Sequence, residues 1–140
     1  MSGFLIDTNV ISEVVRPNPE PKVVNWLRSV NEELLYLSVL TLGEIRKGIE
    51  TVPSARRRTQ LEAWLQSDLS VRFGNRVLNI DQAVADRWGV LQARAKGKGR
   101  PLPVIDGLLA ATALHHNLTF VSRDMGGVVG AGVSVFNPWA

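Results

Sequence analysis

Four acidic residues lie where an alternating order of strands and helices would bring side chains together. Asp7 directly follows an apolar run that is expected to form a strand, and Asp124 closes another such run. Glu44 and Asp106 are each expected in the first turn of a helix. If the strands are parallel, all four carboxylates point toward one edge of the sheet, beyond the carboxyl ends of the strands, where α/β proteins place their functional sites.

Carboxylates gathered at one place repel one another and raise each other's pKa, and a bound divalent cation offsets that repulsion. A set of oxygen ligands suits Mg²⁺ or Mn²⁺ rather than zinc. The chain has no cysteine, which excludes both a thiolate metal site and a disulfide framework. Because an ion held in this way can orient a phosphodiester and activate a water molecule, the pattern favours hydrolysis by in-line attack of a metal-activated water.

Each of the four acids also has a purely structural explanation. Asp7 is suited to an Asx-turn or to capping the helix that follows it. Glu44 stands three residues after Thr41, which is a capping-box spacing. Asp106 in a first helical turn favours the helix dipole, and Asp124 is a common type of turn residue. Spacing alone therefore leaves both explanations open for each acid.

The elements that must position these acids follow from the spacing of the apolar residues. Short apolar runs predict strands at residues 4–6, 34–39, 77–80, 118–122 and 133–136. Apolar residues recur at helical spacing within 23–30, 61–69 and 84–95, and further helices are expected from about Thr41 to Glu50 and from Pro103 to about His116. Strands that alternate with helices predict an α/β fold with a mainly parallel sheet of about five strands, covered by helices on both faces.

The composition is that of an ordinary globular protein. The 140 residues, 45% hydrophobic and 21% charged, are expected to form one domain over 1–140. The first apolar run is interrupted at Asp7, too early for a signal or membrane segment, so a soluble cytoplasmic protein is expected. Setting the four acids aside leaves 9 of the 13 acidic residues against 16 basic ones, a balance that suits a polyanionic substrate.

The local sequences around the four acids resemble those of PIN domains. The relevant stretches are 5–10 (Leu-Ile-Asp-Thr-Asn-Val), 42–48 (Leu-Gly-Glu-Ile-Arg-Lys-Gly), 104–113 (Val-Ile-Asp-Gly-Leu-Leu-Ala-Ala-Thr-Ala) and 119–124 (Thr-Phe-Val-Ser-Arg-Asp). The ending at 135–139 (Val-Phe-Asn-Pro-Trp) resembles the VapC/FitB branch of PIN-domain toxins. Because the stretches follow one another in the family's order over essentially the whole chain, the resemblance is specific.

The resemblance implies a three-layer α/β/α fold and an endoribonuclease that depends on Mg²⁺, with Mn²⁺ as a substitute. It further implies the toxin of a type II toxin–antitoxin system, a homodimer or hetero-oligomer that is silenced by a small cognate antitoxin. Asp7 and Asp106 correspond to the direct metal ligands of the family, and Glu44 and Asp124 would complete the site, often through water.

Thr8 and Ser122 correspond to small polar residues that support such a site. The sequence departs from the family pattern after Asp124, where it reads Met-Gly-Gly-Val-Val-Gly instead of an Asp-Phe continuation. Asp124 is therefore the weakest candidate for a direct ligand.

Other interpretations stay open at this point. A degenerate PIN domain that binds RNA or protein without cutting it would retain the same fold, and a nuclease acting on DNA would share the same chemistry. Asp81 is expected to be a helix N-cap rather than a site residue. Arg56–Arg58 fits a solvated charge run or a phosphate contact, and Lys96–Arg100 is expected to be a basic, flexible loop.

Overall fold

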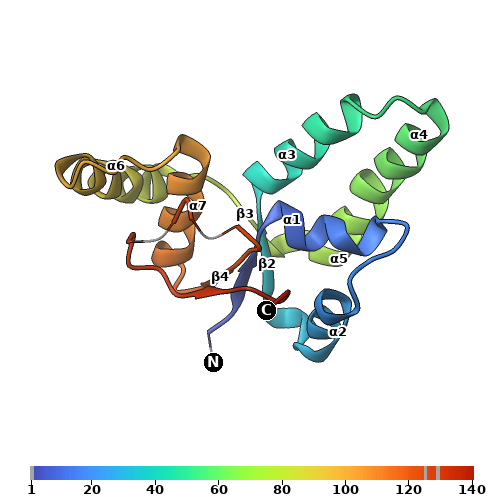
Figure 1. Ribbon diagram of the computed structural model, residues 1–140, viewed down its shortest axis with the longest axis horizontal. Helices are drawn as coiled ribbons and strands as arrows, with labels where there is room; N and C mark the ends of the chain where they lie inside the picture. Colours follow the sequence, from blue (N-terminus) through green and yellow to red (C-terminus); the bar gives the residue numbers. More distant parts are fainter. Residues whose placement is uncertain (1, 125, 129) are drawn as a thin grey trace.

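A computed structural model describes residues 2–124, 126–128 and 130–140. Within these residues, five strands form one parallel sheet in the order β3-β2-β1-β4-β5 (Figure 1). The strands are β1 (Phe4–Ile6), β2 (Leu35–Ser38), β3 (Val77–Leu78), β4 (Thr119–Val121) and β5 (Val135–Phe136). β1 lies at the centre, with Phe4 opposite Leu35 on one side and opposite Thr119 on the other. The predicted parallel sheet is confirmed, although each strand after β1 is shorter than expected.

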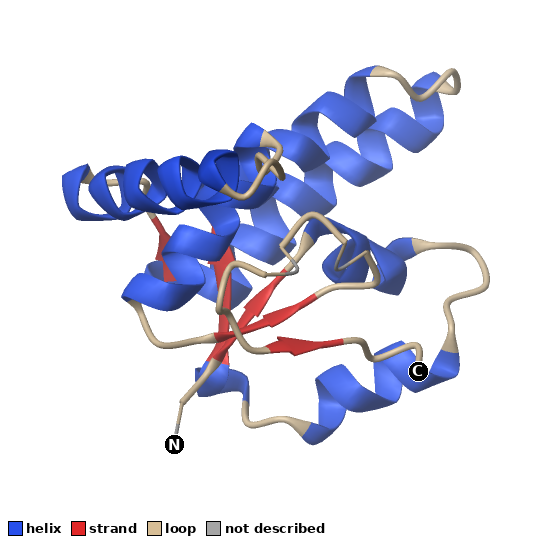
Figure 2. Cartoon of the chain, turned by 60° about the vertical axis from the view of Figure 1, so that its left-hand side comes forward, coloured by secondary structure: helices blue, strands red, loops and turns tan. Residues whose placement is uncertain are grey.

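Helices cover both faces of this sheet (Figures 1 and 2). The α-helices are α1 (Thr8–Ile11), α2 (Pro21–Ser29), α3 (Val39–Glu50), α4 (Ala55–Ala63), α5 (Ser70–Phe73), α6 (Gln82–Gly97) and α7 (Val104–His115). Single 3₁₀ turns occupy Ser12–Val15, Glu32–Leu34 and Gly74–Arg76, and a π-helical segment, Trp64–Leu69, joins α4 to α5.

Alternating side chains of the central strands divide the core into two parts. Ile6 of β1 and Val121 of β4 pack into the core under α1 to α5. Leu5 and Phe120, their neighbours in sequence, pack into the core under α6 and α7. Successive residues of a strand point to opposite faces, so two-sided burial of apolar strands produces the three-layer α/β/α arrangement that was predicted.

The start of α3 differs from the prediction. β2 runs directly into the helix, and the hydroxyl of Ser38 accepts a hydrogen bond from the amide of Leu40 at 3.0 Å. Ser38 is therefore the N-cap, and Thr41 lies inside the helix, fully buried. The expected capping box of Thr41 and Glu44 is wrong, because the helix begins two residues earlier.

Two further boundaries bear on the basic segment at the end of α6. α6 continues through Gly97, so Lys96 and Gly97 are helical and do not belong to a loop. Asp81 accepts a hydrogen bond from the amide of Val84 at 2.9 Å, which confirms its prediction as the N-cap of α6. Across the residues that are described, no helix combines the length and the apolar character that crossing a membrane requires.

Candidate active site

Asp7 lies at the carboxyl end of the central strand, where it also caps α1. One carboxylate oxygen accepts a hydrogen bond from the amide of Thr8 at 2.8 Å. The other accepts one from the hydroxyl of Ser122 at 2.7 Å and a longer one from the side-chain amide of Asn9 at 3.4 Å. Asp7 therefore caps α1, as its sequence context predicted, and the cap uses only one of its two carboxylate oxygens.

Ser122 joins the ends of β1 and β4. It follows β4 directly and is fully buried, and its hydroxyl accepts hydrogen bonds from the amide of Asp124 at 3.1 Å and from the Asn9 side chain at 3.2 Å. Asn9 in turn accepts a hydrogen bond from the amide of Arg123 at 3.2 Å. Ser122 and Asn9 thus fix the direction of the Asp7 carboxylate and the path of the chain after β4.

Asn9 is the site residue that the sequence argument did not single out. The signal that could have identified it is the Asp-Thr-Asn triplet at residues 7–9. An asparagine two residues after an acid at a strand end can donate to the carboxylate and accept from a neighbouring amide with one side chain.

Glu44 lies in the second turn of α3, not in the first, because α3 starts at Val39. One of its carboxylate oxygens accepts a hydrogen bond from the hydroxyl of Thr8 at 2.8 Å. Thr8 therefore connects Glu44 to the residue next to Asp7. The side chain of Glu44 is exposed at this edge of the sheet.

Asp106 lies in the first turn of α7, as predicted, and is half-buried. The backbone of Gly127 lies directly against its carboxyl group. A Cβ atom added at Gly127 would stand 1.9 Å from an oxygen of Asp106 and 2.5 Å from its carboxyl carbon. Only glycine fits there without displacing the acid, so the glycine-rich segment after Asp124 forms one wall of the site.

The N-terminal end of α7 is held in place by α6. The side-chain amide of Gln92 donates to the carbonyl of Leu102 at 2.8 Å and accepts from the Leu102 amide at 3.1 Å. Gly107, the neighbour of Asp106, packs closely against Gln92 and Trp88. These contacts fix the residues on both sides of Asp106, so the position of this acid depends on α6.

The electrostatics connect the four acids. Burial raises the pKa of Asp7 above its usual range, and the nearby Glu44 and Asp106 raise it further, against the lowering effect of its hydrogen bonds from Ser122 and Thr8. Burial also raises the pKa of Asp106, and the charges of Asp124 and Glu44 add to the increase. The charges of the four carboxylates therefore interact with one another, and the four acids form one electrostatic group.

No basic side chain forms an ion pair with these acids in the part of the chain that the structure describes. The ion pairs found there involve Glu13, Glu32 and Glu50, and none involves the four acids. Uncompensated and partly buried carboxylates favour protons or a cation. The site is thus suited to binding positive charge.

The four carboxylates fit Mg²⁺ better than a zinc ion enclosed by four protein ligands. Over the described residues, no three acidic or histidine side chains converge closely enough to enclose a cation by themselves. Mg²⁺ is usually bound through one or two carboxylates and retains several waters, whereas structural zinc is enclosed by four protein ligands. The outward side chain of Asp124 fits a role through water, since one of its oxygens accepts a hydrogen bond from the amide of Gly126 at 3.2 Å.

A groove of about 640 Å³ opens beside the acids and is lined by Thr8, Glu44 and Ile105 together with one side of α3. Gly43 and Gly48 lie along this side of α3, and a Cβ atom at either position would contact nothing. The groove gives the carboxylates a face that a large substrate can approach.

The arginine run is accounted for in part by structural contacts. The guanidinium of Arg57 donates to the carbonyl of Val15 at 2.5 Å, and that of Arg58 donates to the carbonyl of Val52 at 2.6 Å. Both therefore tie α4 to neighbouring chain segments, and only Arg56 of the run is fully exposed.

The fold and the site together define an α/β protein whose acidic side chains gather at the carboxyl edge of a parallel sheet. Residues 4–126 match the PIN domain, and the chain belongs to the PIN-domain family.

Relatives with known names agree with this assignment. The toxin FitB of Neisseria gonorrhoeae is 40% identical over 97% of this chain and 98% of its own length. The VapC ribonuclease Y4jK of Sinorhizobium fredii is 35% identical over 97% of each chain. The crystal structure of FitAcB from Neisseria gonorrhoeae superimposes with a TM-score of 0.92 at 40% identity, covering 97% of this chain and 98% of that one. The chain is therefore similar to toxins of the VapC/FitB type along nearly its whole length.

Proposed function

We propose that this protein is a Mg²⁺-dependent endoribonuclease that acts as the toxin of a toxin–antitoxin pair. The observation that carries the proposal is the group of four carboxylates at one sheet edge, two of them with raised pKa values and none with a basic partner among the described residues. Membership of the PIN-domain family and similarity to a VapC ribonuclease and to the toxin FitB support the choice of substrate and role.

Asp7 and Asp106 would hold Mg²⁺ directly, and Glu44 and Asp124 would act through water. When bound, the ion supplies the positive charge that polarises a phosphodiester and makes an attacking water more acidic. Ser122 and Asn9 would orient the Asp7 carboxylate through the hydrogen bonds described above, so that its geometry is set before the ion binds. Thr8 would hold Glu44 in the same way.

The four acids would also select how the substrate approaches. A polyanion is repelled by carboxylates unless their charge is balanced, so a phosphate of the RNA is expected to lie at the acids and be cut only when the metal is present. The open groove along α3 leaves space for a strand of RNA beside Glu44.

The test is cleavage of a mixed pool of structured RNA by purified, partner-free protein in Mg²⁺, Mn²⁺ or EDTA. Cleavage should require metal, and Asp7→Asn and Asp106→Asn should each lower it by about 100-fold or more while the chain stays folded. Isothermal titration with Mg²⁺ provides a second readout that does not depend on finding the right RNA. Absence of both Mg²⁺ binding and cleavage in the folded wild type would refute the proposal and favour a non-catalytic RNA- or protein-binding domain.

The partner assignment is tested separately. Expression of the chain alone should arrest bacterial growth, and co-expression of a small protein encoded beside its gene should restore it. Size-exclusion chromatography with light scattering of the chain alone and with that partner would distinguish the proposed homodimer from a hetero-oligomer. Growth arrest that is equally strong with Asp7→Asn would contradict a toxic activity based on this site.

A further inference from the structure

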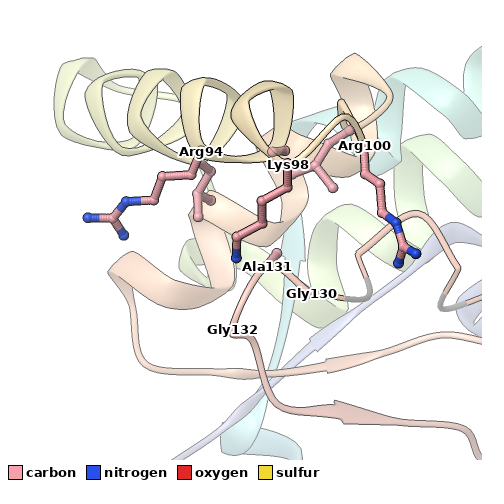
Figure 3. Close-up of a pocket in the computed structure, with 9 residues that line it drawn as sticks. Arg94, Lys98, Arg100, Gly130, Ala131 and Gly132 are labelled. Atoms are coloured by element: carbon pink, nitrogen blue, oxygen red, sulfur yellow. The ribbon is translucent and has the colours of Figure 1, made fainter.

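A basic pocket lies beside the end of α6, away from the carboxylates. Its volume is about 450 Å³, and it is lined by Arg94, Lys98 and Arg100 on one side and by residues 130–132 on the other. Figure 3 shows the side chain of Lys98 reaching toward Ala131 and Gly132, with Arg94 and Arg100 on either side of it. Lys98 thus reaches across the pocket, and the charged ends of Arg94 and Arg100 extend outward from it to either side.

No carboxylate forms an ion pair with these three cations in the part of the chain that the structure describes. No acidic residue lines the pocket. Across residues 2–124, 126–128 and 130–140, the side chains of all three form neither an ion pair nor a hydrogen bond to protein. Three positive charges along one pocket attract a polyanion, whose successive phosphates can each meet a different cation.

The helix dipole explains only part of this arrangement. Basic residues in the last turn of a helix interact favourably with its carbonyl end, which accounts for Arg94 and Lys96. Lys98 and Arg100 lie beyond the last helical residue, yet they face the same pocket as Arg94. Lys96 has the same charge and lies in the same helix end, but it does not line the pocket.

The opposite wall of the pocket is open backbone. Gly130 and Gly132 both have positive φ angles, 88° and 81°, which favour glycine, and no atom lies within 4 Å of a Cβ built at either position. A flexible anion such as a nucleic-acid backbone can therefore approach the backbone at these two glycines closely.

The same segment connects the pocket to the candidate active site. Gly127 packs on the carboxyl group of Asp106, and residues 130–132 line the pocket. Three residues span at most about 10–11 Å of extended chain, so the pocket begins within that distance of the wall of the acidic site. The pocket and the acidic site thus share one segment of the chain, and a single strand of RNA can extend from one to the other.

We propose that Arg94, Lys98 and Arg100 form a phosphate-binding pocket for the backbone of the RNA strand that is cut at the acidic site. This inference rests on the proposed ribonuclease function and adds a second contact for the same substrate. It assigns the basic segment after α6 to binding of the RNA backbone, without base specificity, because phosphate contacts carry no sequence information.

The experiment compares two double variants of equal net charge. Lys98→Gln/Arg100→Gln removes two cations of the pocket, and the control Lys22→Gln/Lys96→Gln removes two exposed cations outside it. Binding of fluorescein-labelled oligouridine is followed by anisotropy in EDTA over a range of KCl concentrations, with circular dichroism to verify folding.

Each lost phosphate contact to a single strand lowers the slope of log K against log salt by about 0.7. For the pocket variant, the magnitude of this slope should therefore be smaller by about 1.4. Between 50 and 200 mM KCl, the affinity of the wild type for RNA should then fall about 7-fold more than that of the variant. The control should keep the slope of the wild type. In Mg²⁺, the pocket variant should raise KM for RNA and leave kcat close to that of the wild type.

Equal slopes for the pocket variant and the control would overturn the pocket while leaving the proposed ribonuclease in place, provided that the wild type binds and cuts RNA. Loss of binding to the antitoxin by the pocket variant, with RNA binding unchanged, would likewise overturn it and assign the cations to a protein partner. A folded wild type that neither binds nor cuts RNA would instead refute the proposed function itself.

Discussion

Ser122→Ala tests whether the site is held together as described. The serine is fully buried between β1 and β4, and its hydroxyl donates to Asp7 at 2.7 Å and accepts from the amide of Asp124 at 3.1 Å. Alanine has nearly the same size, so the substitution removes these hydrogen bonds and little packing. The effect should therefore report on the polar network alone.

The magnitude follows from the two bonds. A hydrogen bond to a charged group contributes about 1.5–3 kcal/mol, and an amide left without a partner in a part-buried place costs about 1 kcal/mol more. Ser122→Ala should thus lower the free energy of unfolding by about 2–4 kcal/mol at pH 7, a large part of the 5–15 kcal/mol that is typical of a domain. Urea unfolding followed by circular dichroism measures this, with the exposed Ser67→Ala as a control that should change little.

The same variant should change the pH dependence of activity. The hydrogen bond from Ser122 lowers the pKa of Asp7, against the effect of burial, which raises it. Without that bond the pKa of Asp7 rises further, so a higher pH is needed to form the carboxylate that would bind Mg²⁺. The acid limb of the pH–rate profile should therefore move to higher pH in Ser122→Ala and stay in place in Ser67→Ala. An unchanged acid limb together with unchanged stability would show that the Ser122–Asp7 bond has no part in the site.

Three further substitutions test other parts of the argument. Gly127→Ala places a Cβ atom 1.9 Å from an oxygen of Asp106 and should lower RNA cleavage by about 100-fold. The control Gly126→Ala, whose Cβ would lie 3.5 Å from its nearest neighbour, should leave cleavage unchanged. Equal cleavage rates for the two variants would contradict the contact between Gly127 and Asp106. Asp106→Asn should stabilise the metal-free protein at pH 7, because burial and neighbouring acids raise the pKa of Asp106 and the folded state then disfavours its charged form. The difference from the wild type should shrink as the pH falls through that raised pKa and vanish below the ordinary value of 3.8, and Mg²⁺ should stabilise the wild type only; urea unfolding in EDTA that finds the variant less stable at pH 7 refutes this. Asp81→Ala removes the N-cap of α6 and should cost about 1 kcal/mol of stability with cleavage retained, and loss of cleavage in the folded variant would mean that Asp81 belongs to the site after all.

Much of the fold could be predicted because burial leaves a direct pattern in the sequence. Strands covered on both faces consist of short apolar runs, and 4–6 and 119–121 are such runs. That Leu5 and Ile6 are buried on opposite faces follows from the same alternation. The order of the strands could not be read in this way, because it depends on contacts between segments that lie far apart in the chain.

The positions of the acids were predicted better than the details that hold them. Asp7 and Asp106 lie within one or two residues of an element boundary, which local sequence can indicate. The predicted start of α3 was wrong because Ser38 is both the last residue of β2 and the N-cap of the helix. The contact of Gly127 with Asp106 joins residues from two separate segments, and only the folded chain brings them together.

The distribution of charge in the folded chain gives the strongest physical reason to expect a polyanion at this site. Several arginines bind groups outside the acidic site: Arg58 binds the carbonyl of Val52, and Arg72 and Arg76 bind Glu32. Among the cations for which the described residues provide no ion pair, Arg94, Lys98 and Arg100 share the pocket beside α6, next to the wall that covers Asp106. Pairing these cations with the acids would neutralise both groups and stabilise the protein alone. Because the two groups are kept apart but adjacent, each can act on a different part of one ligand: the acids on a metal at the phosphate to be cut, and the cations on the phosphate beside it.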